Sequence, residues 1–255
     1  MSGLDGKVAW VTGSSRGIGA AVARLLAQRG ARVAIHGRDR RAVAEVQAEI
    51  AGAGGRAIGV EADVTHYTEI ERARLEIERA LGPIEILVAS AGGSFTPPGP
   101  LEETSEEGWR ASLDGNLTAT FLTVKSVLPG MKERRAGSIV TLSSAAGHHP
   151  HPRSPMPYAA AKAGIEILTR DLAAQVGPFG IRANCIAPET ILTERNKKRI
   201  PEEERPALID AHPIRRLGTP EDVAETALFL VSDQSSWITG IVVDVAGGVA
   251  GYSFS

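Results

Sequence analysis

The chain has 255 residues, of which 43% are hydrophobic and 23% charged, ordinary values for a globular protein that can bury one sizeable core. Its formal net charge of −2 gives no broad electrostatic attraction for nucleic acid or for an anionic membrane. The one cysteine, Cys185, excludes an intrachain disulfide and a metal site built on cysteines.

The expected location of the protein is the cytoplasm. Met1–Trp10 lacks a basic patch followed by a long apolar run, so we expect no secretory signal. The sequence has no apolar stretch of about eighteen uncharged residues, so we expect no membrane span. A single cysteine also fits a reducing compartment.

Short apolar runs rich in β-branched residues alternate with longer segments of helical period. Strands are predicted at Val8–Thr12, Arg32–His36, Arg56–Val60, Ile84–Ala89, Ser138–Ser143, Arg182–Ile186 and Ile241–Val245. Helices are predicted at Ile18–Gln28, Arg40–Ala51, Thr68–Ala80, Tyr158–Val176 and Glu221–Leu230, with one long helix or two in Glu106–Met131. This alternation predicts a single α/β domain over residues 1–255. Its architecture would be a Rossmann-like, doubly wound parallel sheet of about seven strands with helices on both faces.

Three segments interrupt this alternation. Ala91–Pro100 is rich in glycine and proline and is predicted to be a loop. His148–Pro157 holds four prolines and three histidines and is predicted to be irregular. Glu189–Arg216 is polar, mixed in charge and poorly periodic. We expect this last segment to form a mobile lid over a substrate, and a solvated charged helix is compatible with that role.

The first predicted strand runs into the turn Thr12-Gly13-Ser14-Ser15-Arg16-Gly17-Ile18-Gly19. Its glycines allow a tight turn and let the backbone approach a pyrophosphate, while the next helix offers free N–H groups and a positive dipole end. A plain turn is the alternative, but the position between the first strand and the first helix favours a cofactor. The absence of Gly-Lys-Ser/Thr from this turn disfavours a kinase-type phosphate loop. The expected binding residues are Gly13, Ser15, Arg16, Gly17, Ile18 and Gly19.

The end of the second predicted strand bears on the choice between NAD(H) and NADP(H). An acidic residue there would accept hydrogen bonds from the adenosine ribose 2′-hydroxyl and would repel a 2′-phosphate. Gly37 stands where that acid is expected, Arg38 follows it, and Arg16 lies in the glycine-rich turn. Two guanidiniums can pair with a 2′-phosphate, so we favour NADP(H), although both arginines could simply be solvated. Asp39 is the counter-evidence, because a shift of one residue would favour NAD(H).

Tyr158 and Lys162 stand four residues apart at the start of a predicted helix, which places both side chains on one face. A free tyrosine has a pKa of about 10, and a nearby ammonium lowers that pKa by favouring the phenolate. Such a pair can donate a proton to a forming alkoxide, or take one from an alcohol, as hydride moves. The same spacing is common on ordinary amphipathic helices. The rest of the sequence therefore has to show whether Tyr158 and Lys162 are catalytic or belong to a helix surface.

The whole chain resembles the short-chain dehydrogenase/reductase family, and within it the 3-oxoacyl-[acyl-carrier-protein] reductase type. The matching positions are Thr12-Gly13 with Gly17 and Gly19, Asp63-Val64, Ala91-Gly92, Asn116, Ser144, Tyr158 with Lys162, Arg216–Ala224, Thr239-Gly240 and Gly247-Gly248. The resemblance implies the family's fold, a nicotinamide cofactor and chemistry at a carbonyl or a secondary alcohol.

The resemblance also implies roles for single residues. Tyr158 would be the general acid/base, and Lys162 would lower its pKa and hold the nicotinamide ribose. Ser144, preferred over Ser143 from the register of the strand, would hydrogen-bond the substrate carbonyl. Asn116 would position Lys162 through a water. Cofactor contacts are implied at Asp63 and Val64 for adenine, at Ala91 and Gly92, and at Ile191 and Thr193 for the carboxamide.

Two positions depart from the family pattern. The usual Asn-Asn-Ala-Gly reads Ala89-Ser90-Ala91-Gly92, and Ala89 cannot tie neighbouring strands together as the first asparagine does. We expect a local change in stability there, with Ser90 as a partial substitute through its hydroxyl. The usual Pro-Gly after the sixth strand reads Pro188-Glu189, which removes a flexible glycine and adds a carboxylate near the site.

The histidines in His148-His149-Pro150-His151 suggest a metal, but neighbours on a proline-rich loop rarely converge on one ion. We therefore expect no metal, and expect this loop to line the substrate entrance.

The function predicted from these features is an NADP(H)-dependent oxidoreductase for a small carbonyl or alcohol substrate, which can be bound to an acyl carrier. By resemblance, a homotetramer is expected to pack the helices of Glu106–Met131 and Tyr158–Val176 between subunits. One alternative is an NAD-dependent alcohol or sugar dehydrogenase. Another is a non-catalytic NADP(H)-sensing protein, although such proteins usually lose the Tyr or the Lys that this chain keeps.

Overall fold

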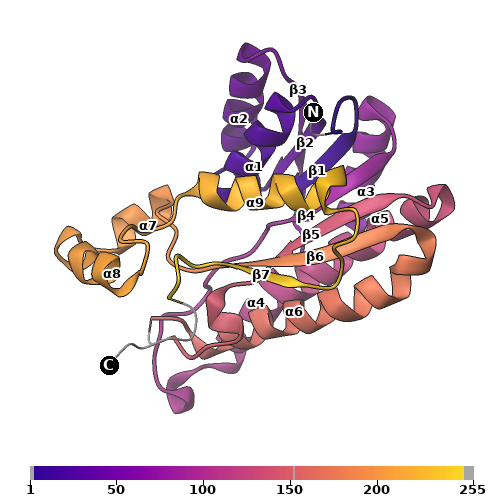
Figure 1. The fold of residues 1–255 in the computed structure, drawn as a ribbon. Helices are drawn as coiled ribbons and strands as arrows, with labels where there is room; N and C mark the ends of the chain where they lie inside the picture. The colour runs from indigo at the N-terminus through magenta and orange to yellow at the C-terminus, as the bar shows by residue number, and fades with distance from the viewer. Residues whose placement is uncertain (1–2, 152, 250–255) are drawn as a thin grey trace.

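The computed structural model describes residues 3–151 and 153–249, so residues 1–2, 152 and 250–255 of the predicted domain lie outside the description. Within the described residues, seven parallel strands form one sheet in the order β3-β2-β1-β4-β5-β6-β7 (Figure 1). The strands are β1 (Val8–Thr12), β2 (Arg32–Gly37), β3 (Arg56–Glu61), β4 (Ile84–Ala89), β5 (Gly137–Leu142), β6 (Ile181–Pro188) and β7 (Val242–Val245). The predicted doubly wound parallel sheet is confirmed.

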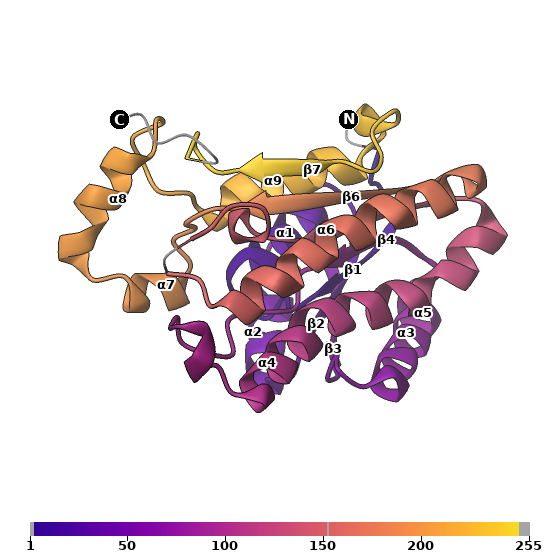
Figure 2. The same cartoon turned by 90° about the horizontal axis from the view of Figure 1, so that it is seen from below.

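Helices cover both faces of the sheet, as Figures 1 and 2 show. One face carries α1 (Gly17–Gln28), α2 (Arg40–Gly52) and α9 (Pro220–Val231); the other carries α3 (Tyr67–Leu81), α5 (Ala119–Arg134) and α6 (Met156–Val176). Every residue of β1 is buried because both faces are covered, which explains why the strands read as continuous apolar runs. Val11 packs into one layer of the core and Trp10 into the other.

The predicted helical segment Glu106–Met131 is two α-helices joined by a wider turn. α4 (Glu106–Leu113) begins after Ser105, whose hydroxyl accepts a hydrogen bond from the N–H of Gly108. A π-helical turn over Asp114–Thr118 then leads into α5. π-Helical turns are rare, and many of those that occur lie at functional sites. This one places Asn116 fully inside the protein.

The order of the strands reverses between β1 and β4, and ligands of doubly wound sheets bind in the crevice at the carboxyl ends of such strands. The chain after β6 forms α7 (Glu194–Arg199) and α8 (Arg205–Ala211), which stand beside the sheet at this end rather than on either face (Figures 1 and 2). These helices have only six and seven residues, which explains why the sequence of this segment showed no helical period. No helix in the described part of the chain combines the length and the apolar composition that crossing a bilayer requires.

Candidate active site

The glycine-rich turn after β1 is fastened to β2 by buried hydrogen bonds. The hydroxyl of Ser14 donates to the carbonyl of Val11 at 2.6 Å and accepts from the N–H of His36 at 2.9 Å. The N–H of Gly13 donates to Nδ1 of His36 at 3.3 Å. Burial lowers the pKa of His36 to about 4, so the imidazole is neutral and can accept this bond. Neither Ser14 nor His36 was singled out from the sequence.

The glycines of this turn allow contacts that a side chain would prevent. A Cβ on Gly13, whose φ is 65°, would lie 2.7 Å from Cα of Ala91, and a Cβ on Gly19 would collide with the carbonyl of Gly13. The residue before α1, Arg16, makes no side-chain hydrogen bond to the helix, so the first N–H groups of α1 are left for another acceptor. A glycine cradle before an uncapped helix start fits the pyrophosphate of a dinucleotide.

The end of β2 carries the residues predicted to distinguish NADP(H) from NAD(H). A Cβ on Gly37 would lie 2.9 Å from the Ser15 hydroxyl, so a side chain there would require Ser15 to move. Asp39 instead begins α2, where it accepts from the N–H of Ala42 and pairs with Arg16 at 2.6 Å. Arg38 lies 3.5 Å from Asp63. Both guanidiniums are largely exposed, so these ion pairs are weak and can be exchanged for a stronger anion.

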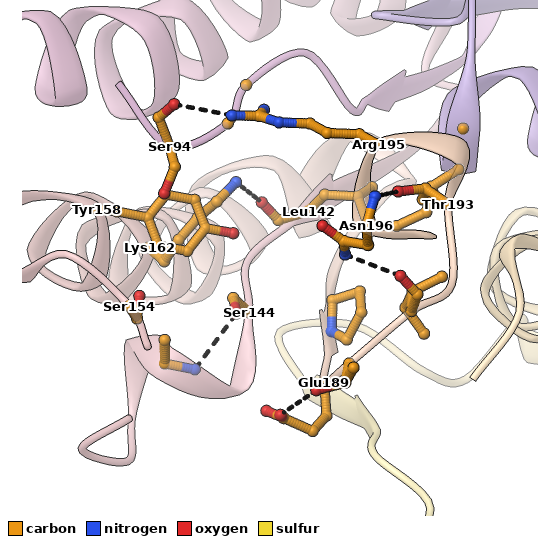
Figure 3. Close-up of a pocket in the computed structure, with 18 of the residues that line it drawn as sticks. Ser94, Leu142, Ser144, Ser154, Tyr158, Lys162, Glu189, Thr193, Arg195 and Asn196 are labelled. Carbon is orange, nitrogen blue, oxygen red and sulfur yellow. Dashed lines mark hydrogen bonds between the residues drawn. The ribbon is translucent and has the colours of Figure 1, made fainter. Parts of the chain in front are cut away.

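Lys162 is the buried cation of the site. Its Nζ donates to the carbonyl of Leu142 at 2.7 Å and lies 5.4 Å from the centre of the Tyr158 ring (Figure 3). Burial lowers the pKa of Lys162 to about 8. Helix α6 begins two residues before the predicted Tyr158, at Met156, with Pro157 in its first turn. Tyr158 therefore lies in the first turn of α6 and Lys162 one turn further on.

Ser144 and Tyr158 line the same cavity. Burial raises the pKa of Tyr158, while the Ser144 hydroxyl and the charge of Arg195 act to lower it. Burial outweighs both effects. The predicted lowering of this pKa by Lys162, whose Nζ lies over the Tyr158 ring, stays a prediction. The hydroxyl of Ser144 also accepts from the N–H of Ala146 at 3.3 Å.

The neighbouring serine is occupied elsewhere. The hydroxyl of Ser143 donates to the Glu166 carboxylate at 2.7 Å and contacts the carbonyl of Lys162 at 3.0 Å. Both Ser143 and Glu166 are buried. This arrangement leaves Ser144 as the serine that faces Tyr158.

Asn116 ties the π-helical turn to the loop after β4. Its side-chain amide donates to the carbonyls of Gly93 at 2.9 Å and Ser112 at 2.8 Å, and its Oδ1 accepts from the N–H of Gly93 at 3.0 Å. The predicted role of Asn116 toward Lys162 stays a prediction, because these hydrogen bonds hold the loop at Gly93. The N–H groups of Ser90 and Ala91 both donate to the hydroxyl of Thr12. In this contact Ser90 uses its backbone, whereas the sequence suggested its hydroxyl.

A cavity of about 430 Å³ joins the glycine-rich turn to the Tyr158 region. The predicted site residues that line it are Gly13, Arg16, Gly17, Ile18, Gly19, Gly92, Ser144, Tyr158, Lys162, Ile191 and Thr193. The predicted residues that are not among its lining are Ser15, Arg38, Asp63, Val64, Ala91 and Asn116; of these, Arg38 and Asp63 line a separate groove. Ser94 and Leu142 also line the cavity, although the sequence did not place them in the site. Arg195, from the predicted lid, and Arg153 and Ser154, from the predicted irregular segment 148–157, line it as well.

The two unusual features near the substrate side, the histidine loop and Glu189, contact each other. His151 Nε2 lies 3.2 Å from the Glu189 carboxylate, which also accepts from the Thr190 hydroxyl at 2.9 Å. Burial acts to raise the pKa of Glu189, but the bonds from His151 and Thr190 outweigh it and leave that pKa below its usual value. His148 faces away, toward Glu166 at 2.8 Å and Asp244 at 3.1 Å. In residues 3–151 and 153–249, no His, Cys, Asp and Glu side chains gather in a group suited to a metal ion.

Comparison with known proteins agrees with this geometry. A family model described as enoyl-(acyl carrier protein) reductase matches residues 13–250. Cyclohexanol dehydrogenase of Rhodococcus sp. strain TK6 is 39% identical over 264 residues, covering 96% of this chain and 97% of that protein. The 3-oxoacyl-[acyl-carrier-protein] reductase of Vibrio cholerae is 37% identical over 246 residues, covering 96% and 98%.

A solved structure shares the whole fold. The 3-oxoacyl-[acyl-carrier protein] reductase with bound NAD from Brucella melitensis superposes with a TM-score of 0.90 at 36% identity, covering 98% of this chain and 95% of that one. The family model and these relatives each span nearly all of this chain. The chain therefore belongs to the short-chain dehydrogenase/reductase family, whose members are oxidoreductases that act on CH–OH and C=O groups with a nicotinamide cofactor.

Proposed function

We propose that this protein is an NADP(H)-dependent oxidoreductase that transfers hydride between the nicotinamide and a carbonyl or secondary alcohol. One observation carries the proposal: Ser144, Tyr158 and a buried Lys162 line one cavity together with the uncapped start of α1. A proton-transfer group thus faces the same space as a cradle suited to a dinucleotide.

The bound cofactor supplies a site on its nicotinamide that accepts or donates hydride. Ser144 and Tyr158 hold the substrate oxygen with their hydroxyls, which stabilises negative charge as it develops on that oxygen. Tyr158 donates its proton to the forming alkoxide during reduction and takes the proton of the alcohol during oxidation. Lys162, still protonated at neutral pH with a pKa of about 8, stabilises the phenolate that reduction leaves on Tyr158.

Substitution of Tyr158 tests the mechanism. Tyr158→Phe keeps the ring that packs near Lys162 but removes the proton, so turnover should fall by about 10²–10⁴-fold. The measurement is kcat on a panel of carbonyl substrates with NADPH and of alcohols with NADP, with cofactor binding followed by fluorescence as the control. Intact turnover in Tyr158→Phe would overturn the proposal.

The preference for NADP(H) is supported by the end of β2. Gly37 supplies no carboxylate that would repel a 2′-phosphate, and Asp39 is engaged by the first turn of α2 and by Arg16. Arg16 and Arg38 can exchange their exposed carboxylate partners for the doubly charged phosphate. Arg38→Asp should weaken the use of NADPH more than that of NADH. An unchanged ratio of kcat/KM for the two cofactors would contradict this assignment.

The first alternative is an NAD-dependent alcohol or sugar dehydrogenase. The name of the Rhodococcus relative, cyclohexanol dehydrogenase, and the NAD bound to the Brucella structure favour it, while the Vibrio relative favours a 3-oxoacyl thioester reductase. The same panel, assayed with both cofactors and with a 3-oxoacyl thioester included, separates the three. Cofactor binding without turnover of any panel member would instead favour an NADP(H)-sensing protein without catalysis.

We also propose that residues 189–216 form a lid and that the protein is a homotetramer. Two contacts join this segment to the opposite wall of the cavity: Arg195 donates to the carbonyl of Ser94 at 3.1 Å, and Arg153 lies 2.6 Å from Glu204.

Exposed apolar side chains on α5 and α6, Phe121 and Ile167, support packing of those helices between subunits. Light scattering of the protein and of Ile167→Glu tests the tetramer, since the new charge should lower the measured mass.

A further inference from the structure

Several charged side chains outside the glycine-rich turn line the cavity. The basic ones are His151, Arg153, Arg195 and Arg199, and the acidic ones are Glu189 and Glu194. Arg153 is paired with Glu204, and His151 with Glu189. Arg195 donates to a backbone carbonyl, and no carboxylate of the described residues forms an ion pair with it. Arg195 is therefore a cation in the cavity wall whose charge is not neutralised by a carboxylate.

Arg195 lies on the substrate side of the cavity. Two residues earlier, Thr193 faces the glycine-rich turn, with its methyl 3.4 Å from the position of a Cβ on Gly17. Arg195 instead crosses to Ser94, above Tyr158 in Figure 3. Gly93 allows this path, because a Cβ there would lie 2.9 Å from Nη1 of Arg195. The charge of Arg195 also acts to lower the pKa of Tyr158, which lines the same cavity.

The acidic residues of the cavity do not cancel this charge. Glu189 is held by His151 and by the Thr190 hydroxyl, and Glu194 is paired with Lys197 at 2.8 Å. A second donor is close by, since the buried hydroxyl of Ser154 lines the same cavity and has no hydrogen-bond partner among the described residues. A buried hydroxyl without a partner is costly unless a ligand supplies one. Arg195 favours an acceptor that carries negative charge, and the Ser154 hydroxyl can donate to any hydrogen-bond acceptor.

We propose that the substrate is a small ketone or alcohol that carries a carboxylate, and that Arg195 recognises that carboxylate. The planar guanidinium can give two parallel hydrogen bonds to a carboxylate, and Ser154 can give a further one. The substrate is small because a cavity of about 430 Å³ also has to hold the nicotinamide end of the cofactor. This inference rests on the proposed carbonyl and alcohol chemistry and adds the class of substrate.

The experiment compares oxo acids of three to six carbons with neutral methyl ketones of the same chain length. The expected result is a kcat/KM for the acids about tenfold or more above that for the ketones, as a charge-assisted hydrogen bond implies. Arg195→Gln should lower the ratio of these two kcat/KM values about tenfold, chiefly through KM of the acids, and Arg195→Lys should restore part of it. Lys198→Gln is the matched control, because it removes an exposed cation of α7 that does not line the cavity.

Two results would overturn the inference. One is a wild-type preference for the neutral ketones. The other is an Arg195→Gln variant in which the ratio of kcat/KM for acids to that for ketones is unchanged. If such a variant raised only the KM for NADPH, Arg195 would be assigned to the pyrophosphate of the cofactor. Absence of turnover with every substrate would instead refute the proposed function. Calorimetric titration with hexanoate and hexanamide then decides the inference separately: it is supported only if hexanoate binds more tightly and this preference is lost in Arg195→Gln.

Discussion

The two sides of the cavity are held in place by different interactions. On the cofactor side, Ser14 and His36 join the glycine-rich turn to β2 through buried hydrogen bonds between neutral groups. On the substrate side, the loop before α6 and the segment after β6 meet through charged side chains, as in Arg153–Glu204 and His151–Glu189. Arg153 and Glu204 are each more than two-fifths exposed, whereas Ser14 and His36 are almost fully buried.

This difference distinguishes a cofactor side whose geometry is fixed from a substrate side whose geometry can adjust. Breaking one partner of a buried hydrogen bond costs about 1–3 kcal/mol, whereas an exposed ion pair contributes about 0–1 kcal/mol. The cofactor side should therefore keep one geometry, and the substrate side should adjust to salt and ligand. Three substitutions or titrations test this contrast.

The largest effect is expected from a side chain added to the cofactor side. Gly19→Ala places a methyl group against the carbonyl of Gly13, and the turn cannot yield because Ser14 and His36 hold it. Overpacking of this kind costs about 3 kcal/mol, which corresponds to roughly a hundredfold in Kd for the cofactor. Fluorescence titration with NADPH and NADH measures this change.

Gly52→Ala is the control for that substitution. Gly52 ends α2, and a Cβ there would have no atom within 4 Å. Alanine at this position should leave cofactor binding unchanged and should slightly stabilise the fold. Equal Kd values for the Gly19→Ala and Gly52→Ala variants would show that the turn is not rigid.

The second effect is a loss of stability in acid through His36. The unfolded imidazole takes up a proton below its usual pKa of 6.5, while the folded one stays neutral until about pH 4. The unfolded state therefore binds more protons in this range, and the free energy of unfolding falls as the pH falls. Between pH 6.5 and pH 5 the loss should be about 1.5 kcal/mol.

Urea denaturation at several pH values measures this loss. His36→Gln keeps a group that can accept from the N–H of Gly13 but does not titrate. Its free energy of unfolding should change less over the same pH range. If the variant and the wild type lose stability in parallel, another group causes the acid sensitivity.

The same contrast explains how much the sequence could predict. The sheet, the glycine-rich turn and the residues Ser144, Tyr158 and Lys162 follow local patterns of spacing and period, and the structure brings these groups to one cavity. The role of His36 was not visible, because its bond to Gly13 depends on the register of two strands.

The substrate side was harder to predict, because its contacts join residues far apart in sequence that belong to no motif. Arg195 contacts Ser94, which is 101 positions away, and Arg153 contacts Glu204 across the cavity mouth. The sequence marked the histidine loop and Glu189 as unusual, but only the fold shows that they bond to each other. The effect of burial on the pKa of Tyr158 was also not visible from the sequence, since burial is a property of the folded site.

The smallest effect tests the charged contact between His151 and Glu189. The Glu189 carboxylate raises the pKa of His151, against the lowering effect of burial. Because the folded pKa is raised, the pair contributes stability that is complete below the unfolded pKa and is lost as the pH rises through the folded pKa. Glu189→Gln should lower the pKa of His151 and cost less than about 1 kcal/mol of stability at pH 6, since His151 is partly exposed.

An NMR titration of the His151 ring protons measures this pKa. Glu194→Gln is the control, because it removes a cavity carboxylate paired with Lys197 and should leave the pKa of His151 unchanged. An equal shift in both variants would mean that His151 senses the net charge of the cavity rather than its bond to Glu189.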